Sequence, residues 1–162
     1  MTDRKIADEN AVTWYNQGVE LAQKGAYGEA IFCFDKALTL NPGDTNILNT
    51  KALALQKSGR FEEAMAAYDK VLEIDPQNIN ALTDKGQVCH RLGRYGEALS
   101  CYERSLAVRP DVFETWYNKA LAQVNINRLE DAFKSIKTAL KLEPGHAHAL
   151  KLKDLLKEKI GG

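Results

Sequence analysis

The spacing of the prolines is the feature that most constrains the fold of this chain. Other residues recur with the same period, and the period is too regular for an ordinary globular sequence. The prolines lie 34 residues apart, at Pro42, Pro76, Pro110 and Pro144. Small residues recur at Ala30, Ala64, Ala98 and Ala132, and turn residues recur at Gly25, Gly59, Gly93 and Asn127. A fixed period of this length indicates an array of structural repeats, which run over residues 11–44, 45–78, 79–112 and 113–146.

Each repeat is predicted to form two short antiparallel helices. In the first repeat, Trp14, Gly18 and Leu21 recur at helical spacing and predict an amphipathic helix over 11–24. Gly25 follows it, where a residue with positive φ ends a helix at low cost. A second apolar face then begins, and it ends before Pro42 because proline disfavours helix at the preceding residue and breaks it at its own position.

The small and large residues of this unit suggest how hairpins pack. We expect Gly18 and Ala30 to let the two helices of one hairpin approach closely. We expect Trp14, Tyr27 and Phe34 to fill the space between neighbouring hairpins. One hairpin cannot bury its apolar stripe alone, but stacked hairpins share a continuous core.

These residues resemble the tetratricopeptide repeat, a helix–turn–helix module of the same length. The first repeat carries the family positions at Trp14, Gly18, Leu21, Ala30, Phe34, Ala37 and Pro42. The fourth repeat departs from the pattern at Gln123, Asn127 and Ile136. The resemblance implies an all-α fold, a right-handed superhelical solenoid of antiparallel helix pairs.

The segments outside the repeats have separate predictions. Residues 1–10 are predicted to be a polar N-terminal extension, and residues 161–162 a frayed end. Residues 147–160 are predicted to be a helix that caps the fourth repeat, with Leu150, Leu155, Leu156 and Ile160 along one side. The alternative is a basic amphipathic helix for a membrane surface or a partner, which Asp154 and Glu158 disfavour.

The resemblance also implies a concave binding face, lined by the first helix of each hairpin. The face is rich in amides, which donate and accept hydrogen bonds and so pair with the backbone of an extended peptide. Aromatic and aliphatic residues among them are expected to supply side-chain pockets. The predicted binding residues are Tyr15, Asn16, Val19, Asn46, Asn49, Thr50, Leu53, Asn80, Thr83, Asp84, Gln87, Tyr117, Asn118 and Leu121, with Val12, His90 and Arg91 beside them. The alternative is that these amides only solvate an exposed helix face.

One special kind of binding is disfavoured. Family members that grip acidic chaperone tails use a carboxylate clamp of Lys, Arg and Asn. The matching positions in the first three repeats hold no Lys or Arg: they are Tyr15, Val19, Thr50, Asn80 and Asp84. A terminal carboxylate would meet no paired cation there.

Charge and composition narrow the partner to a protein or peptide. Lys+Arg and Asp+Glu number 22 each, which argues against nucleic acid as the partner. The apolar stretches are too short to enter a membrane, and the polar start does not look like a signal peptide. The three cysteines do not suggest a disulfide framework, so we expect a cytoplasmic protein.

The sequence predicts no enzymatic activity, and it predicts no bound cofactor or metal. The sequence has no phosphate loop, nucleophile elbow or zinc pattern. His146 and His148 are more simply surface histidines than metal ligands. The expected function is a non-catalytic interaction module or scaffold. The alternative is a structural scaffold that self-associates through repeat edges into homo-oligomers, because the outer face around Trp14 and Tyr27 needs covering.

Overall fold

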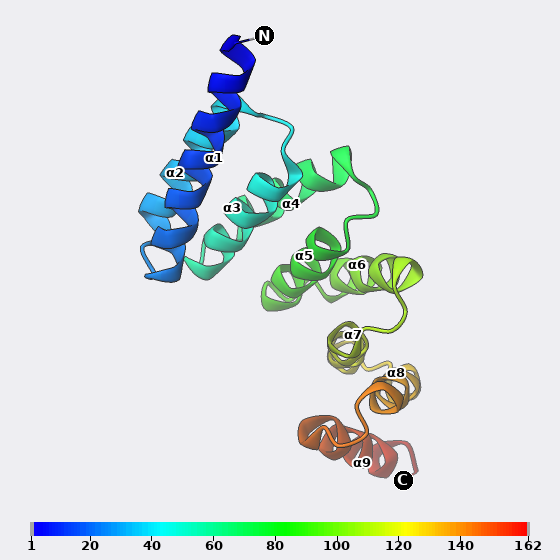
Figure 1. The fold of residues 1–162 in the computed structure, drawn as a ribbon. Coiled ribbons are helices and arrows are strands. Elements are labelled where there is room, and N and C mark those ends of the chain that lie inside the picture. Colours follow the sequence, from blue (N-terminus) through cyan, green and yellow to red (C-terminus); the bar gives the residue numbers. More distant parts are fainter. Residues whose placement is uncertain (1, 162) are drawn as a thin grey trace. The chain divides into compact units, whose positions relative to one another are not determined.

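A computed structural model describes residues 2–161, and the predicted ends at Met1 and Gly162 lie outside the described residues. Side chains are described from residue 10 onward. Within this range the chain forms nine helices and no strand. Figure 1 labels the helices along the chain. They are α1 (Thr2–Gln23), α2 (Tyr27–Leu40), α3 (Thr45–Lys57), α4 (Phe61–Ile74), α5 (Ile79–Arg91), α6 (Tyr95–Val108), α7 (Phe113–Asn125), α8 (Leu129–Leu142) and α9 (Ala147–Gly161). The predicted all-α fold of antiparallel helix pairs is confirmed.

The helix bounds differ from prediction at both ends of the chain. α1 begins at Thr2, so residues 2–10 of the predicted extension continue the first helix, which was expected to start at residue 11. α9 includes Gly161, which was predicted to fray. Among the described residues, none of the helices is long and apolar enough to cross a membrane.

The turn inside each hairpin is built in the same way four times. Gly25, Gly59, Gly93 and Asn127 have φ values of 79°, 81°, 73° and 58°. The residue after each donates its backbone N–H to a carbonyl one turn back, as Ala26 does to Leu21 at 2.9 Å. This bond closes a helix end around a left-handed residue. The predicted positive φ is confirmed, and the fourth repeat achieves it with asparagine, which tolerates that conformation better than other side chains.

The chain divides into two compact units, one ending at Ala81 and the other beginning at Leu82. The first contains α1–α4 and the start of α5, and the second contains the rest of α5 and α6–α9. In the first unit, the fully buried Phe34 lies against Gly18 and Tyr15 of its own hairpin. Phe34, which was predicted to fill the space between neighbouring hairpins, thus makes these contacts inside its own hairpin. Gly18 makes room for the ring, because a β-carbon there would come within 2.6 Å of Phe34 Cε1.

The buried face of the capping helix shares only Leu156 with the face that was predicted. Ala149 and Leu156 are buried in a core formed with α7 and α8, and Leu152 packs against it. Leu150, Leu155 and Ile160 remain 36%, 43% and 37% exposed. The buried residues follow the spacing of one helix face, and the small Ala149 on that face lets α9 approach closely.

Candidate binding groove

A polar hollow lies between α1 and α3 in the first unit. Its volume is about 630 Å³. Its lining comes from α1, the loop before α3, α3 itself and the first turn of α5: Ala11, Val12, Tyr15, Asn41, Asp44, Asn46, Ile47, Asn49, Thr50 and Asn80. Side chains predicted from three successive repeats are thus brought together around one space.

Local hydrogen bonds hold the α3 side of this hollow. Asp44 precedes α3, and its Oδ1 accepts the N–H groups of Asn46 and Ile47 at 2.9 and 3.1 Å. This satisfies backbone donors that a helix start leaves open. Thr50 Oγ1 lies 2.8 Å from Asn46 O and 3.4 Å from Tyr15 Oη, so its hydroxyl links α1 to α3. The Asn46 side chain remains exposed beside these hydrogen bonds.

Asn49 has a different place from its neighbours. Its Nδ2 donates to Asn78 Oδ1 at 3.2 Å, and the same oxygen accepts the N–H of Ala81 at 3.0 Å. Asn49 thereby joins α3 to the start of α5. Its own Oδ1 is buried and has no hydrogen-bond partner among the described residues. Asn49 therefore supports the wall of the hollow, whereas Asn46 and Asn80 present exposed amides.

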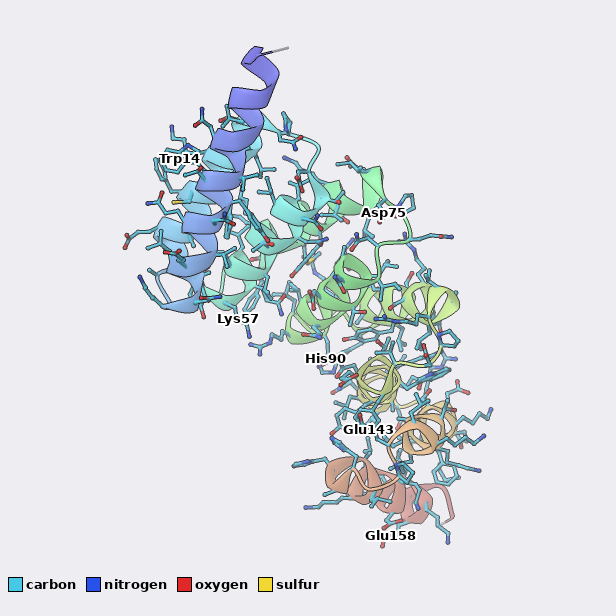
Figure 2. The ribbon with its side chains drawn as sticks, in the orientation of Figure 1. Trp14, Lys57, Asp75, His90, Glu143 and Glu158 are labelled. Atoms are coloured by element: carbon cyan, nitrogen blue, oxygen red, sulfur yellow. The ribbon has the colours of Figure 1, made fainter. Side chains whose placement is uncertain are left out.

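An apolar pocket of about 260 Å³ adjoins the polar hollow, because Thr50 lines both. Its lining comes from α1, α2 and α3: Val19, Ala22, Gln23, Tyr27, Thr50, Leu53, Ala54 and Lys57. Leu53 is 40% exposed, although it is a large hydrophobic residue. Lys57 ends α3 and is labelled in Figure 2. Val19, Thr50 and Leu53 were predicted as binding residues, but Ala22, Tyr27 and Lys57 were not.

The remaining predicted residues occupy several environments. Asn16, on α1, is exposed and lines neither of these two hollows. In the second unit, Thr83 Oγ1 lies 3.0 Å from the hydroxyl of buried Ser105, so Thr83 links α5 to α6. Among the other predicted binding residues of the second unit, four are half-buried: Asp84, Gln87, Asn118 and Leu121.

Two histidines of the second unit pack against aromatic rings. His90, labelled in Figure 2, is half-buried on α5, and burial lowers the pKa of its imidazole. Tyr117 stacks on Phe113 with ring centroids 5.8 Å apart, and His146 lies 5.5 Å from Tyr117. His146 Nδ1 also accepts the N–H of Ala149 at 3.2 Å, so it caps α9. His146, which was predicted to be a surface histidine, is half-buried.

The three cysteines are free and buried. A hydrogen bond to Cys101, together with burial, raises the pKa of the Cys89 thiol. Burial also raises the pKa of the Cys33 thiol. Because the thiolate is the reactive form, Cys33 and Cys89 act as small apolar residues.

Comparison with known proteins gives two family matches. The model described as "Anaphase-promoting complex, cyclosome, subunit 3" matches residues 23–105, and the model described as "Tetratricopeptide repeat" matches residues 83–147. No curated protein matches the sequence.

Solved structures share the fold at low sequence identity. A crystal structure of MamA has a TM-score of 0.89 at 18% identity and covers 94% of this chain and 84% of that one. MamA from Desulfovibrio magneticus gives the same TM-score at 22% identity and covers 94% and 86%. The first TPR of Spaghetti (RPAP3), bound to an HSP90 peptide, has a TM-score of 0.70 at 23% identity and covers 73% and 94%.

Proposed function

Since this chain belongs to the tetratricopeptide repeat family, whose domains are generally protein–protein interaction modules, we propose that it binds an extended segment of a partner protein. The binding site is the groove that the polar hollow and the apolar pocket form in the first unit. No catalytic step is assigned to it. A solved relative of this fold holds a peptide, which supports the proposal for this chain.

The proposal rests on one observation: the polar hollow and the apolar pocket are neighbours, because Thr50 lines both. Exposed amides at Asn46 and Asn80 border the polar hollow and suit the backbone of an extended chain, whatever its sequence. The adjoining pocket suits a side chain. An extended segment spans about 3.3 Å per residue, so a few residues reach from one hollow to the other.

The predicted residues of the second unit are proposed as peptide contacts within that unit alone. Gln87, Asn118 and Leu121 are half-buried, and Thr83 is bonded to Ser105. The segment meets no carboxylate clamp, because Lys and Arg are absent from the corresponding positions of the first three repeats.

Selection from a displayed library of random peptides tests the proposal. Wild-type protein should enrich a set of peptides, and Asn46→Ala/Asn80→Ala should bind them at least several-fold more weakly, because two backbone-pairing amides are removed. Both residues are exposed, so helicity by circular dichroism should not change. Gln17→Ala, an exposed change on α1 outside both hollows, is the matched control. Equal binding by a folded double variant would place the contact elsewhere.

A second candidate function, self-association, is favoured by one observation. Phe32 on α2 is 56% exposed, and its ring lies edge-on to Trp14 with centroids 6.4 Å apart. The later repeats carry Ala66, Ser100 and Lys134 at this position, so the first repeat alone presents an aromatic ring there. Tyr27 lies instead in the apolar pocket. Sedimentation at rising concentration should then show association that Phe32→Ser abolishes, whereas a wild-type protein that stays monomeric would contradict this function.

A further inference from the structure

The internal repeat allows the apolar pocket to be compared with its counterpart in the second unit. Residues two periods apart occupy equivalent positions in the two units. Tyr27 and Leu53 of the pocket correspond to Tyr95 and Leu121, which keep the same kind of side chain. The other lining residues differ, apart from Ala54: Val19, Ala22, Gln23, Thr50 and Lys57 correspond to Gln87, His90, Arg91, Asn118 and Asn125. Two of these changes, Ala22 to His90 and Lys57 to Asn125, belong together, because His90 and Asn125 contact each other.

In the second unit, the His90 side chain occupies the equivalent position. Its ring is 5.2 Å from the Tyr95 ring, in an edge-on arrangement. Asn125 Nδ2 lies 3.2 Å from His90 Nε2 and also donates to Leu121 O at 2.9 Å. The bond to the carbonyl fixes the orientation of the amide, so His90 Nε2 is the acceptor. In the second unit, the His90 ring thus fills the space beside Tyr95. Its Nε2 atom accepts a hydrogen bond from Asn125 at the end of α7.

In the first unit, the equivalent residue is Ala22, whose side chain is only a methyl group, and the pocket beside it is open. Val19, Tyr27 and Leu53 line it with apolar surface. Lys57 stands where Asn125 stands in the second unit, and no ion pair forms at Lys57 within the described part of the chain. The donor at the rim is therefore a cation, which favours an anionic acceptor more than a neutral one.

We propose that this pocket takes one large apolar side chain of the partner segment, with an acidic residue next to it that pairs with Lys57. The inference rests on the proposed function, since it names the chemistry of the segment that the groove binds. Burial of the apolar side chain against Val19, Tyr27 and Leu53 supplies the affinity. The acidic neighbour adds a smaller preference, because an ion pair at an exposed rim contributes little energy by itself.

The test copies the filled arrangement of the second unit into the first. Ala22→His/Lys57→Asn reproduces the pair of His90 and Asn125, so the new side chain should occupy the pocket without disturbing the fold. Peptides enriched by wild-type protein should carry Leu, Ile, Met or Phe beside Asp or Glu. Synthetic versions of these peptides should bind the double variant about tenfold more weakly or worse, because the side-chain contact is lost.

Three further variants make the result decisive. Lys57→Glu should reverse the preference for acidic neighbours while keeping the apolar residue. Ala107→His places the same change on an exposed position of α6 and should bind like wild type. If the double variant fails to fold, Leu53→Gln gives the same readout, since Leu53 is partly exposed and Gln87 occupies its position in the third repeat.

The outcomes separate this inference from the proposed function. Peptides that lack an apolar–acidic pair, need Asn46 and Asn80, and bind Ala22→His/Lys57→Asn at full strength would overturn the inference and leave the proposed function intact. Failure of the wild-type protein to enrich any peptide would overturn both.

Discussion

At Gly18 and Gly86, the first helix of a hairpin lies directly against an aromatic ring of the second. A β-carbon would come within 2.6 Å of Phe34 Cε1 at Gly18 and within 2.5 Å of Tyr102 Cε1 at Gly86. Both rings are fully enclosed, at 0% and 1% exposure, so neither has space to turn away. The glycines are thus required by the size of the facing ring.

We therefore predict that Gly86→Ala destabilises the protein. Overpacking costs about 1–3 kcal/mol, which exceeds the gain of up to about 1 kcal/mol from replacing glycine by alanine within a helix. Urea unfolding followed by circular dichroism measures the difference. Gly96→Ala is the control, since nothing lies within 4 Å of a β-carbon there, and its stability should equal or exceed that of wild type. Equal stability of the two variants would contradict the close approach.

His90 predicts a pH dependence of stability. Burial lowers its pKa from the ordinary 6.5, so the unfolded chain binds this proton more readily than the folded protein. The free energy of unfolding should fall as pH drops below about 6.5, until His90 is also protonated in the folded protein, and then change no further on its account. Urea unfolding across this range should show a shallower fall for His90→Gln than for wild type. His148→Gln, at an exposed position, should keep the full dependence, and an unchanged slope in His90→Gln would contradict the prediction.

At the scale of elements, the residue before each first helix recurs with the repeat. Asp44 and Asn78 accept backbone N–H groups of α3 and α5, and His146 Nδ1 accepts one from α9. Val112 takes this position before α7 and makes no side-chain cap. The start of α7 therefore lacks the side-chain hydrogen bond that the other three helices have. The backbone of Val112 is nevertheless extended, as a capping residue requires.

Replacing Val112 by aspartate should stabilise α7. A side-chain cap is worth about 0.5–2 kcal/mol, and the negative charge also suits the helix start. The half-buried position of Val112 sets the gain near the lower limit. Thermal unfolding should show a higher midpoint for Val112→Asp and a lower one for Asp44→Ala. A lower midpoint for Val112→Asp would mean that the valine contributes packing of greater value than the missing cap.

At the scale of the whole molecule, the parts that the sequence predicted are those decided locally. The turns around Gly25 and Asn127 follow from backbone conformation and a repeated spacing, and both have the expected positive φ. The buried face of α9 depends on what α8 offers, and this is why Leu155 was wrongly placed in it and the small Ala149 was not included.

In the candidate site, too, the sequence predicted some residues and missed others. Amides such as Asn46 and Asn80 stand out in the sequence and are found at one hollow. The apolar pocket was missed because a single alanine such as Ala22 does not indicate a pocket. Its role becomes visible only when Ala22 is compared with His90, which lies two repeats later at the same position. A side chain that leaves space carries no sequence signal of its own, so only the arrangement of its neighbours reveals the pocket.

The most direct test of the central claim is a nitrogen-15 NMR titration of the full chain with the tightest peptide from the selection. Chemical-shift changes should concentrate around the two hollows of the first unit, at Val12, Asn46, Leu53, Lys57 and Asn80. Changes centred on Phe32 and the outer face of the first repeat, or on the exposed Leu155 of α9, would contradict it.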